Sequence, residues 1–255
     1  MNVKTLLFQL DLGDTLDVVG RADEALPMLN QAVEGMLLAL PFPHEFTNRA
    51  LIVRGAVHFS LKDLEAAESD WLQALEASST LLGKDAPTTN AIRSNLSLLY
   101  RAQGRYDESI TLSRQVLDAE EALPDNHHSI LIGRINHAAL LREVERLDES
   151  SALLEASVEQ ARSILPEGHW ITGGALTELG KTRLFQGDHA GSVVALEEAY
   201  GMLQASLGSE NPRVKGVEQG LAEVYGAWNE LEPDPERAEL AASWKRRFEG
   251  SAVDE

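Results

Sequence analysis

The chain has 255 residues, with 41 acidic and 22 basic side chains, and its formal net charge is −19 at pH 7. This charge argues against binding nucleic acid, because neutralising phosphates needs a basic surface. The sequence has no cysteine, which excludes disulfides and thiolate zinc sites, and its 44% hydrophobic content is enough for a sizeable core.

The N-terminal stretch from Met1 to Leu10 has one lysine, and its apolar run is broken by Gln9 and Asp11. It is too short and too acidic downstream to be a signal peptide or a membrane span, so we expect a soluble, cytoplasmic protein. Only 5% of residues are aromatic, and Ala, Leu and Glu recur with few β-branched runs. This composition predicts an all-helical chain.

A pattern of an apolar helical stretch, a turn residue and an acidic helix start recurs along the whole chain. Consecutive turn centres are 41 or 42 residues apart. A period of this length is typical of repeat arrays, so each period predicts one helix-turn-helix hairpin. The centres are Gly20, Lys62, Gly104, Glu145, Gly187 and Asn229.

Two packing positions support this register. Residues seven before each centre are small, which lets two helices approach closely, and residues nine after are mostly bulky. Eight of the nine prolines fall in expected loops or at a helix start, and Pro27 falls near the first turn of a second helix. The small set is Gly13, Gly55, Ser97, Ala138, Gly180 and Ala222, and the second set is Leu29, Trp71, Ser113, Leu154 and Leu196.

The clearest period runs from Asn95 to Ser109 as Asn-Leu-Ser-Leu-Leu-Tyr-Arg-Ala-Gln-Gly-Arg-Tyr-Asp-Glu-Ser, and Leu-Gly-x-x-x-Pro occurs at 82–87 and 207–212. These stretches resemble the tetratricopeptide repeat, and more narrowly its long-repeat subclass of kinesin light chains and many bacterial proteins. Lys62 and Glu145 depart from the turn glycine of that pattern. HEAT and armadillo arrays share the period but not this spacing of small residues.

The resemblance implies an all-α, right-handed α-solenoid of about six hairpins. We expect a single domain over 1–255, with repeats at about 1–41, 42–83, 84–125, 126–166, 167–208 and 209–250. The last repeat carries extra residues at 230–234 and then a polar helix. This ending resembles the C-terminal cap of repeat regions that follow bacterial eukaryotic-like Ser/Thr kinases, although the sequence has no kinase motif.

Three histidines, His44, His127 and His169, recur in phase, eighteen residues before a turn centre, where Asn211 stands in the last repeat. Equivalent loops of successive hairpins lie at least a helix diameter apart, about 10 Å, which is too far for shared metal ligation. We interpret these residues as helix-start residues and predict no metal and no cofactor. No catalytic triad or phosphate loop stands out, so we expect no enzyme activity.

The first helices of stacked hairpins line the concave side that repeat proteins use for binding. Two pairs recur there in register, Asn95 with Arg101 and Asn136 with Arg142. Arginine can bind a carboxylate through two hydrogen bonds, and the kinesin-light-chain resemblance implies that the asparagines hold an extended peptide. Alternatively, the asparagines satisfy neighbouring helices and the arginines pair with acids of the chain. The candidate groove residues are Arg49, Phe59, Asn95, Arg101, Asn136, Arg142 and Lys181.

These features predict a non-catalytic scaffold or adaptor whose groove binds a partner peptide or helix with an acidic segment or a C-terminal carboxylate. No nucleic acid or membrane is expected as a partner. The alternative is a ligand- or peptide-responsive regulator of a bacterial signalling system, which includes a detached regulatory module of a kinase.

Overall fold

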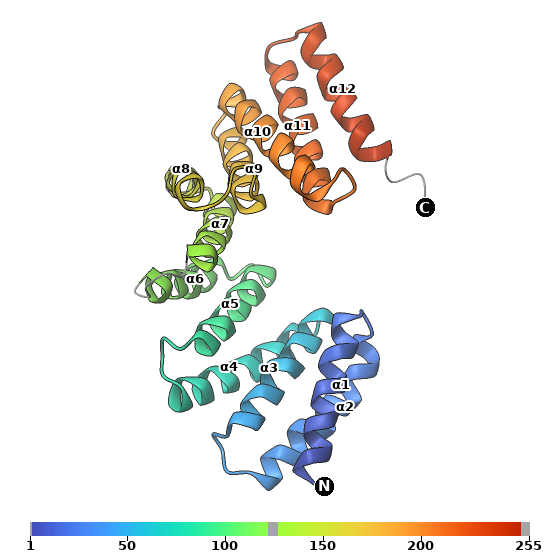
Figure 1. Cartoon of the computed structure of the whole chain (residues 1–255), viewed down its shortest axis with the longest axis vertical. Helices are drawn as coiled ribbons and strands as arrows, with labels where there is room; N and C mark the ends of the chain where they lie inside the picture. The colour runs from blue at the N-terminus through green and yellow to red at the C-terminus, as the bar shows by residue number, and fades with distance from the viewer. Residues whose placement is uncertain (1, 122–126, 251–255) are drawn as a thin grey trace. The chain divides into compact units, whose positions relative to one another are not determined.

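The computed structural model describes residues 2–121 and 127–250, and in these residues it has twelve helices and no strand (Figure 1). The expected all-α array of hairpins is confirmed. Each expected repeat range holds one pair of helices. The pairs are α1 (Val3–Val18) with α2 (Ala22–Ala39), α3 (Glu45–Ser60) with α4 (Leu64–Leu81), α5 (Pro87–Ala102) with α6 (Tyr106–Glu121), α7 (His127–Glu143) with α8 (Leu147–Ile164), α9 (Trp170–Phe185) with α10 (His189–Leu207), and α11 (Pro212–Leu231) with α12 (Pro235–Gly250).

The chain divides by its own packing into two compact units, Met1–Ala122 and Leu123–Glu255. We call them the N-unit and the C-unit, and each contains three consecutive hairpins. A single domain over 1–255 stays a prediction.

Five of the six predicted turn centres adopt a positive φ, the conformation that reverses the chain between two helices. At Lys62 and Glu145 a residue with a side chain takes this conformation, which glycine adopts more readily. The Asp63 amide donates to the carbonyl oxygen of His58 at 2.9 Å, which closes the helix end as a glycine turn would. The φ angles are 78° at Gly20, 66° at Lys62, 74° at Gly104, 60° at Glu145 and 79° at Gly187.

The sixth predicted turn, at Asn229, is wrong. Helix α11 continues through Asn229 to Leu231, and the chain reverses over the extra residues that follow. The Asn229 side-chain oxygen accepts a hydrogen bond from the Asp234 amide at 2.8 Å, which holds the longer loop against the helix end. Pro235 then begins α12, where its missing N–H costs nothing.

The two predicted packing positions meet inside the hairpins. A Cβ added to Gly13 would lie 2.7 Å from Leu29, and one added to Gly180 would lie 2.6 Å from Leu196. A third position, five residues after the turn centre, holds serine in the third, fourth and fifth hairpins, and its buried hydroxyl donates to a carbonyl oxygen of the first helix. These bonds run from Ser109 to Ser97 at 2.7 Å, from Ser150 to Ala138 at 2.8 Å and from Ser192 to Gly180 at 2.7 Å.

The helix-start role holds for His44 and His169, whose Nδ1 atoms accept hydrogen bonds from Phe46 N and Ile171 N at 3.2 Å. Asn211 caps α11 in the same way. Asn2, in phase with them, caps α1. The predicted role of the His127 side chain lies outside the described side chains.

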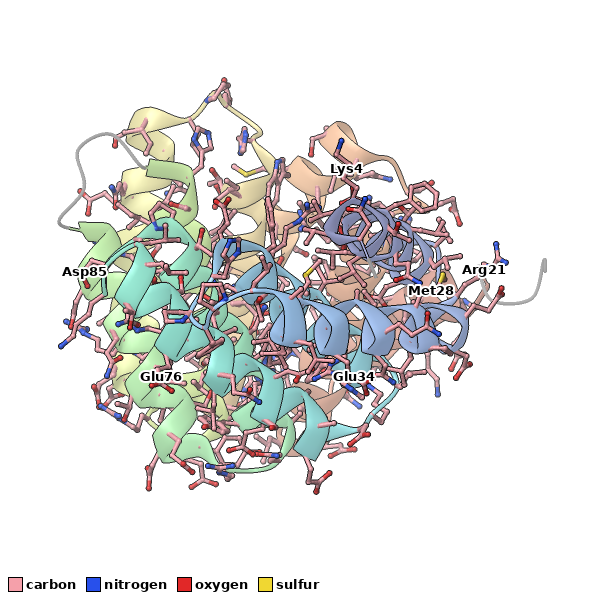
Figure 2. The ribbon with its side chains drawn as sticks, turned by 90° about the horizontal axis from the view of Figure 1, so that it is seen from below. Lys4, Arg21, Met28, Glu34, Glu76 and Asp85 are labelled. Carbon is pink, nitrogen blue, oxygen red and sulfur yellow. The ribbon has the colours of Figure 1, made fainter. Side chains whose placement is uncertain are left out.

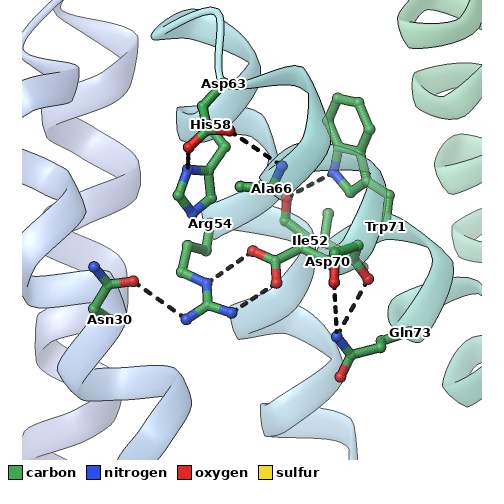
Figure 3. Close-up of polar contacts among 10 residues, drawn as sticks. Asn30, Ile52, Arg54, His58, Asp63, Ala66, Asp70, Trp71 and Gln73 are labelled. Carbon is green, nitrogen blue, oxygen red and sulfur yellow. Dashed lines mark hydrogen bonds and ion pairs between the residues drawn. The ribbon is translucent and has the colours of Figure 1, made fainter.

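The core of the N-unit contains a buried ion pair between α3 and α4 (Figure 3). The Arg54 guanidinium donates to both carboxylate oxygens of Asp70, at 2.8 and 2.6 Å, and also to the Asn30 side chain of α2 at 3.2 Å. Asp70 is only 2% exposed. Arg54 thus ties three helices together at a position where four of the other five hairpins carry a leucine and the fourth hairpin carries His137.

Candidate functional site

The predicted binding residues lie on first helices of the hairpins, and within each unit we call the side of these helices that carries them the helix-A face. In the N-unit this face belongs to α1, α3 and α5. Arg49 of α3 donates to Asp11 of α1 at 2.6 Å, and both side chains are about half exposed. Phe59 lies partly buried against Trp71, with ring centroids 5.7 Å apart. Both predicted residues therefore have partners within the chain.

Asn95 and Arg101 lie on α5 and are partly buried. They flank Leu98, which is 48% exposed and lies between them on the same side of the helix. This row offers an apolar side chain between two polar ones. It belongs to the N-unit, whereas Asn136 and Arg142 belong to the C-unit, and a clamp shared by the two pairs stays a prediction.

In the C-unit the structure brings Arg142 of α7 and Lys181 of α9 together on one carboxylate. Arg142 donates to Glu178 at 3.0 Å, and the Lys181 ammonium donates to the other oxygen of Glu178 at 2.8 Å. The Arg142 guanidinium also lies 5.4 Å from the ring centre of Phe185. We call Arg142, Glu178, Lys181 and Phe185 the Arg142 cluster.

The Arg142 cluster has two cations for one anion. Burial of Glu178 by itself would raise the pKa of its carboxyl, but Lys181 and Arg142 outweigh burial and hold this pKa below its ordinary value. Glu178 is therefore ionised at neutral pH, and the cluster keeps a net positive charge. The Arg142 Nε atom is buried and has no hydrogen-bond partner among the described residues.

The first helices of the C-unit also expose apolar side chains and backbone. Phe185 is 62% exposed and Ile132 of α7 is 36% exposed, while Asn136 is exposed on the same helix. At Gly174 of α9 and Gly216 of α11, an added Cβ would meet no atom within 4 Å. These glycines share the register of Ile132, so the helix-A face of the C-unit exposes backbone there.

Sequence reasoning missed the pairing of Arg142 with Glu178 and the place of Phe185 beside it. A signal was present, because the two charges are 36 residues apart, slightly less than one period. Other contacts between neighbouring hairpins have similar spacings: Arg49 with Asp11, Arg105 with Glu68 and Arg162 with Glu198. A search for opposite charges at this separation would have found them.

A cavity of about 340 Å³ lies between α8, α9 and α10 of the C-unit, apart from the Arg142 cluster. Its lining includes the apolar side chains of Val158, Leu176 and Val194. The other lining residues include two ion pairs, from Arg183 to Glu155 and from Arg162 to Glu198.

No group of three metal-binding side chains occurs among residues 2–121 and 127–250. Within the same ranges, every helix is too short or too polar to cross a membrane.

Comparison with known families finds tetratricopeptide repeat models matching residues 10–81 and 46–122. The chain is 24% identical over 169 residues to a Clustered mitochondria protein homolog of Aspergillus niger. That alignment covers 66% of this chain but 14% of the fungal protein, so the chain spans only a small part of this relative's length.

Solved structures with a similar fold include a repeat protein of Podosopora anserina described as a kinesin light chain with nearly identical TPR-like repeats. It superposes with a TM-score of 0.73 at 20% identity, over 81% of this chain and 98% of that one. A Rap protein complexed with Competence and Sporulation Factor superposes with a TM-score of 0.66 at 16% identity, over 96% of this chain and 67% of that one. At these identities the likeness is one of fold.

Proposed function

The chain is a tetratricopeptide repeat protein, and from this fold we propose that it is a non-catalytic scaffold whose helix-A face in the C-unit binds a segment of a partner protein. Arrays of this family generally mediate protein–protein interaction. The Arg142 cluster carries the proposal, because it combines an exposed aromatic ring with a local excess of positive charge in a strongly acidic chain.

The proposed partner segment carries a carboxylate, either from an acidic side chain or from a C-terminus. Lys181, which is 33% exposed, is its first contact, since Arg142 is only 14% exposed. Exchanging Glu178 for a partner carboxylate replaces one ion pair by another, so we expect little net free energy from it. Covering Phe185 is worth more, about 2 kcal/mol for full burial of such a side chain.

Asn136 supports an extended partner segment. Its amide is exposed on α7 and can both donate to and accept from a peptide backbone. Asn95 and Arg101 offer a related pair of groups on α5 of the N-unit. The proposal places the scaffold in the cytoplasm, which cell fractionation would test.

Selection of peptides from a random display library on the full chain tests this function. We expect enriched peptides to carry Asp, Glu or a free C-terminal carboxylate, and to bind a Phe185→Ala/Lys181→Ala variant about tenfold more weakly or worse. A Leu72→Ala variant, which removes an exposed leucine of α4 outside the helix-A face, is the matched control. Peptides that bind all three proteins equally would contradict the proposal.

A second candidate is a peptide-responsive regulator, and the likeness to the Rap protein complex over 96% of this chain favours it. A scaffold binds its partner without a large change in shape, whereas a regulator changes its state on binding. Small-angle scattering of the chain with and without a selected peptide separates the two. A clear change in radius of gyration supports the regulator.

A further inference from the structure

Helix α1 of the N-unit exposes a row of side chains, whereas the Arg142 cluster belongs to the C-unit. Phe8 is 67% exposed, Leu12 is 38% exposed and Val19, at the end of the helix, is 61% exposed. Together with the exposed Thr15 they recur every three or four residues and form one stripe. Figure 2 views this end of the chain, where Lys4, Arg21 and Met28 lie on the same hairpin.

The repeat register shows what this stripe would normally contact. Phe8, Leu12 and Thr15 stand twelve, eight and five residues before their turn centre. In α5 and α11 the corresponding side chains are fully buried, and the second helix of the preceding hairpin packs there, α4 on α5 and α10 on α11. These buried sets are Ile92, Leu96 and Leu99, and Val217, Leu221 and Val224. The stripe of α1 is therefore a helix-docking surface with no described helix on it.

We propose that this stripe binds an amphipathic helix with basic flanks from a partner protein, in the position that α4 occupies on α5. The occupant is a helix because a helix covers the same register positions inside both units. It is basic because the first hairpin carries six acidic and only two basic side chains over residues 3–39. Complementary charge favours such an encounter and disfavours like-charged partners.

A second copy of this chain fits the stripe poorly. The first hairpin of a second copy carries the same excess of acidic side chains, so the two hairpins would repel each other. Its last helix, α12, has no buried residue, and its surface carries ion pairs from Arg246 to Glu239 and from Lys245 to Glu249. That polar surface offers no apolar row to cover Phe8 and Leu12.

The test uses a peptide with the sequence of α4, Leu64–Leu81, carrying Glu65→Lys, Ser69→Lys, Gln73→Lys and Glu76→Lys at exposed positions. Its binding to the full chain is measured by fluorescence anisotropy, beside the unsubstituted α4 peptide. We expect the lysine-bearing peptide to bind more tightly, and a Phe8→Ser/Leu12→Ser variant to weaken its binding by about tenfold or more. A Leu98→Ser variant, altered at an exposed leucine of another surface, keeps the affinity.

Equal affinity for the chain and both variants would overturn the proposal, and equal binding of the two peptides would overturn the basic partner. A dimer seen in sedimentation that the Phe8→Ser/Leu12→Ser change abolishes would instead assign the stripe to a second copy. Both substitutions are at exposed side chains, and unchanged circular dichroism verifies that the variants are folded.

Discussion

The backbone of Gly55 lies directly against the indole ring of Trp71, so that a Cβ at Gly55 would be 2.5 Å from the indole nitrogen. The same indole N–H donates to the carbonyl oxygen of Ile52 at 3.1 Å, which fixes the ring in place. The ring cannot move away without losing this bond. Close approach of the two helices in this hairpin therefore depends on glycine.

We expect Gly55→Ala to lower the free energy of unfolding by about 1–3 kcal/mol, because the added methyl group overpacks a fixed ring. Gly174→Ala is the matched change, since its Cβ would meet nothing within 4 Å. It should stabilise by up to about 1 kcal/mol through helix propensity. Urea unfolding followed by circular dichroism measures both, and similar effects from the two changes would refute the packing argument.

The buried pair of Arg54 and Asp70 predicts a contrast between single and double changes. Asp70→Leu leaves the Arg54 guanidinium, 17% exposed, without its carboxylate, and should cost about 3–5 kcal/mol. Arg54→Leu/Asp70→Leu removes both charges and places leucine where α5 has Leu96. The double variant should be close to the parent chain in stability. A double variant less stable than Asp70→Leu would show that the pair itself stabilises the fold.

The pKa of Glu178, lowered by Lys181 and Arg142 against the effect of burial, predicts a pH dependence. A depressed carboxyl pKa gives stability that is present above the pKa of the unfolded chain and is lost as pH falls through the folded pKa. Glu178→Gln should therefore be less stable than the parent at pH 7, by about 1–3 kcal/mol, with the gap closing in acid. Glu159→Gln, at an exposed carboxylate of α8, is the control. A gap that stays constant from neutral to acid pH would contradict this account.

Burial, with the hydrogen bond to Glu197 at 3.0 Å, raises the pKa of Tyr225 to about 12. A raised pKa means that the protonated Tyr225 side chain stabilises the folded state. An unperturbed tyrosine has a pKa of about 10, so this contribution is complete below that pH and is lost as pH rises through the folded value. A titration of tyrosinate absorbance should show two late-titrating groups, because burial and the charge of Glu68 also raise the pKa of Tyr100. Glu197→Gln should bring only the Tyr225 group to lower pH, and an unchanged titration would exclude the contact.

Much of the fold followed from local sequence patterns. Positive φ at Lys62 and Glu145 was predictable because their spacing placed them in phase with three turn glycines. The predicted turn at Asn229 was wrong. The repeat spacing alone does not show that α11 continues when the extra residues 230–234, which end in a proline-rich stretch, follow this position. Local signals such as glycine and proline outweigh periodicity at such a point.

The candidate site was less predictable than the fold. The sequence placed Arg142 and Lys181 on the same face, but the carboxylate between them depends on how two hairpins are offset. A contact across 36 residues is set by that offset, not by the pattern within one helix. In the structure Arg49 pairs with Asp11 and Arg142 pairs with Glu178. These contacts agree with the alternative in which the arginines pair with acids of the chain.

The central claim is that Phe185 and its neighbouring cations bind a partner segment. The most direct measurement compares the dissociation constant of a selected carboxylate-bearing peptide for the parent chain, for Phe185→Ala and for Leu72→Ala. We predict that Phe185→Ala weakens binding by about tenfold or more, while Leu72→Ala leaves it unchanged. Equal affinity for the parent and Phe185→Ala, with both proteins folded, would contradict the claim.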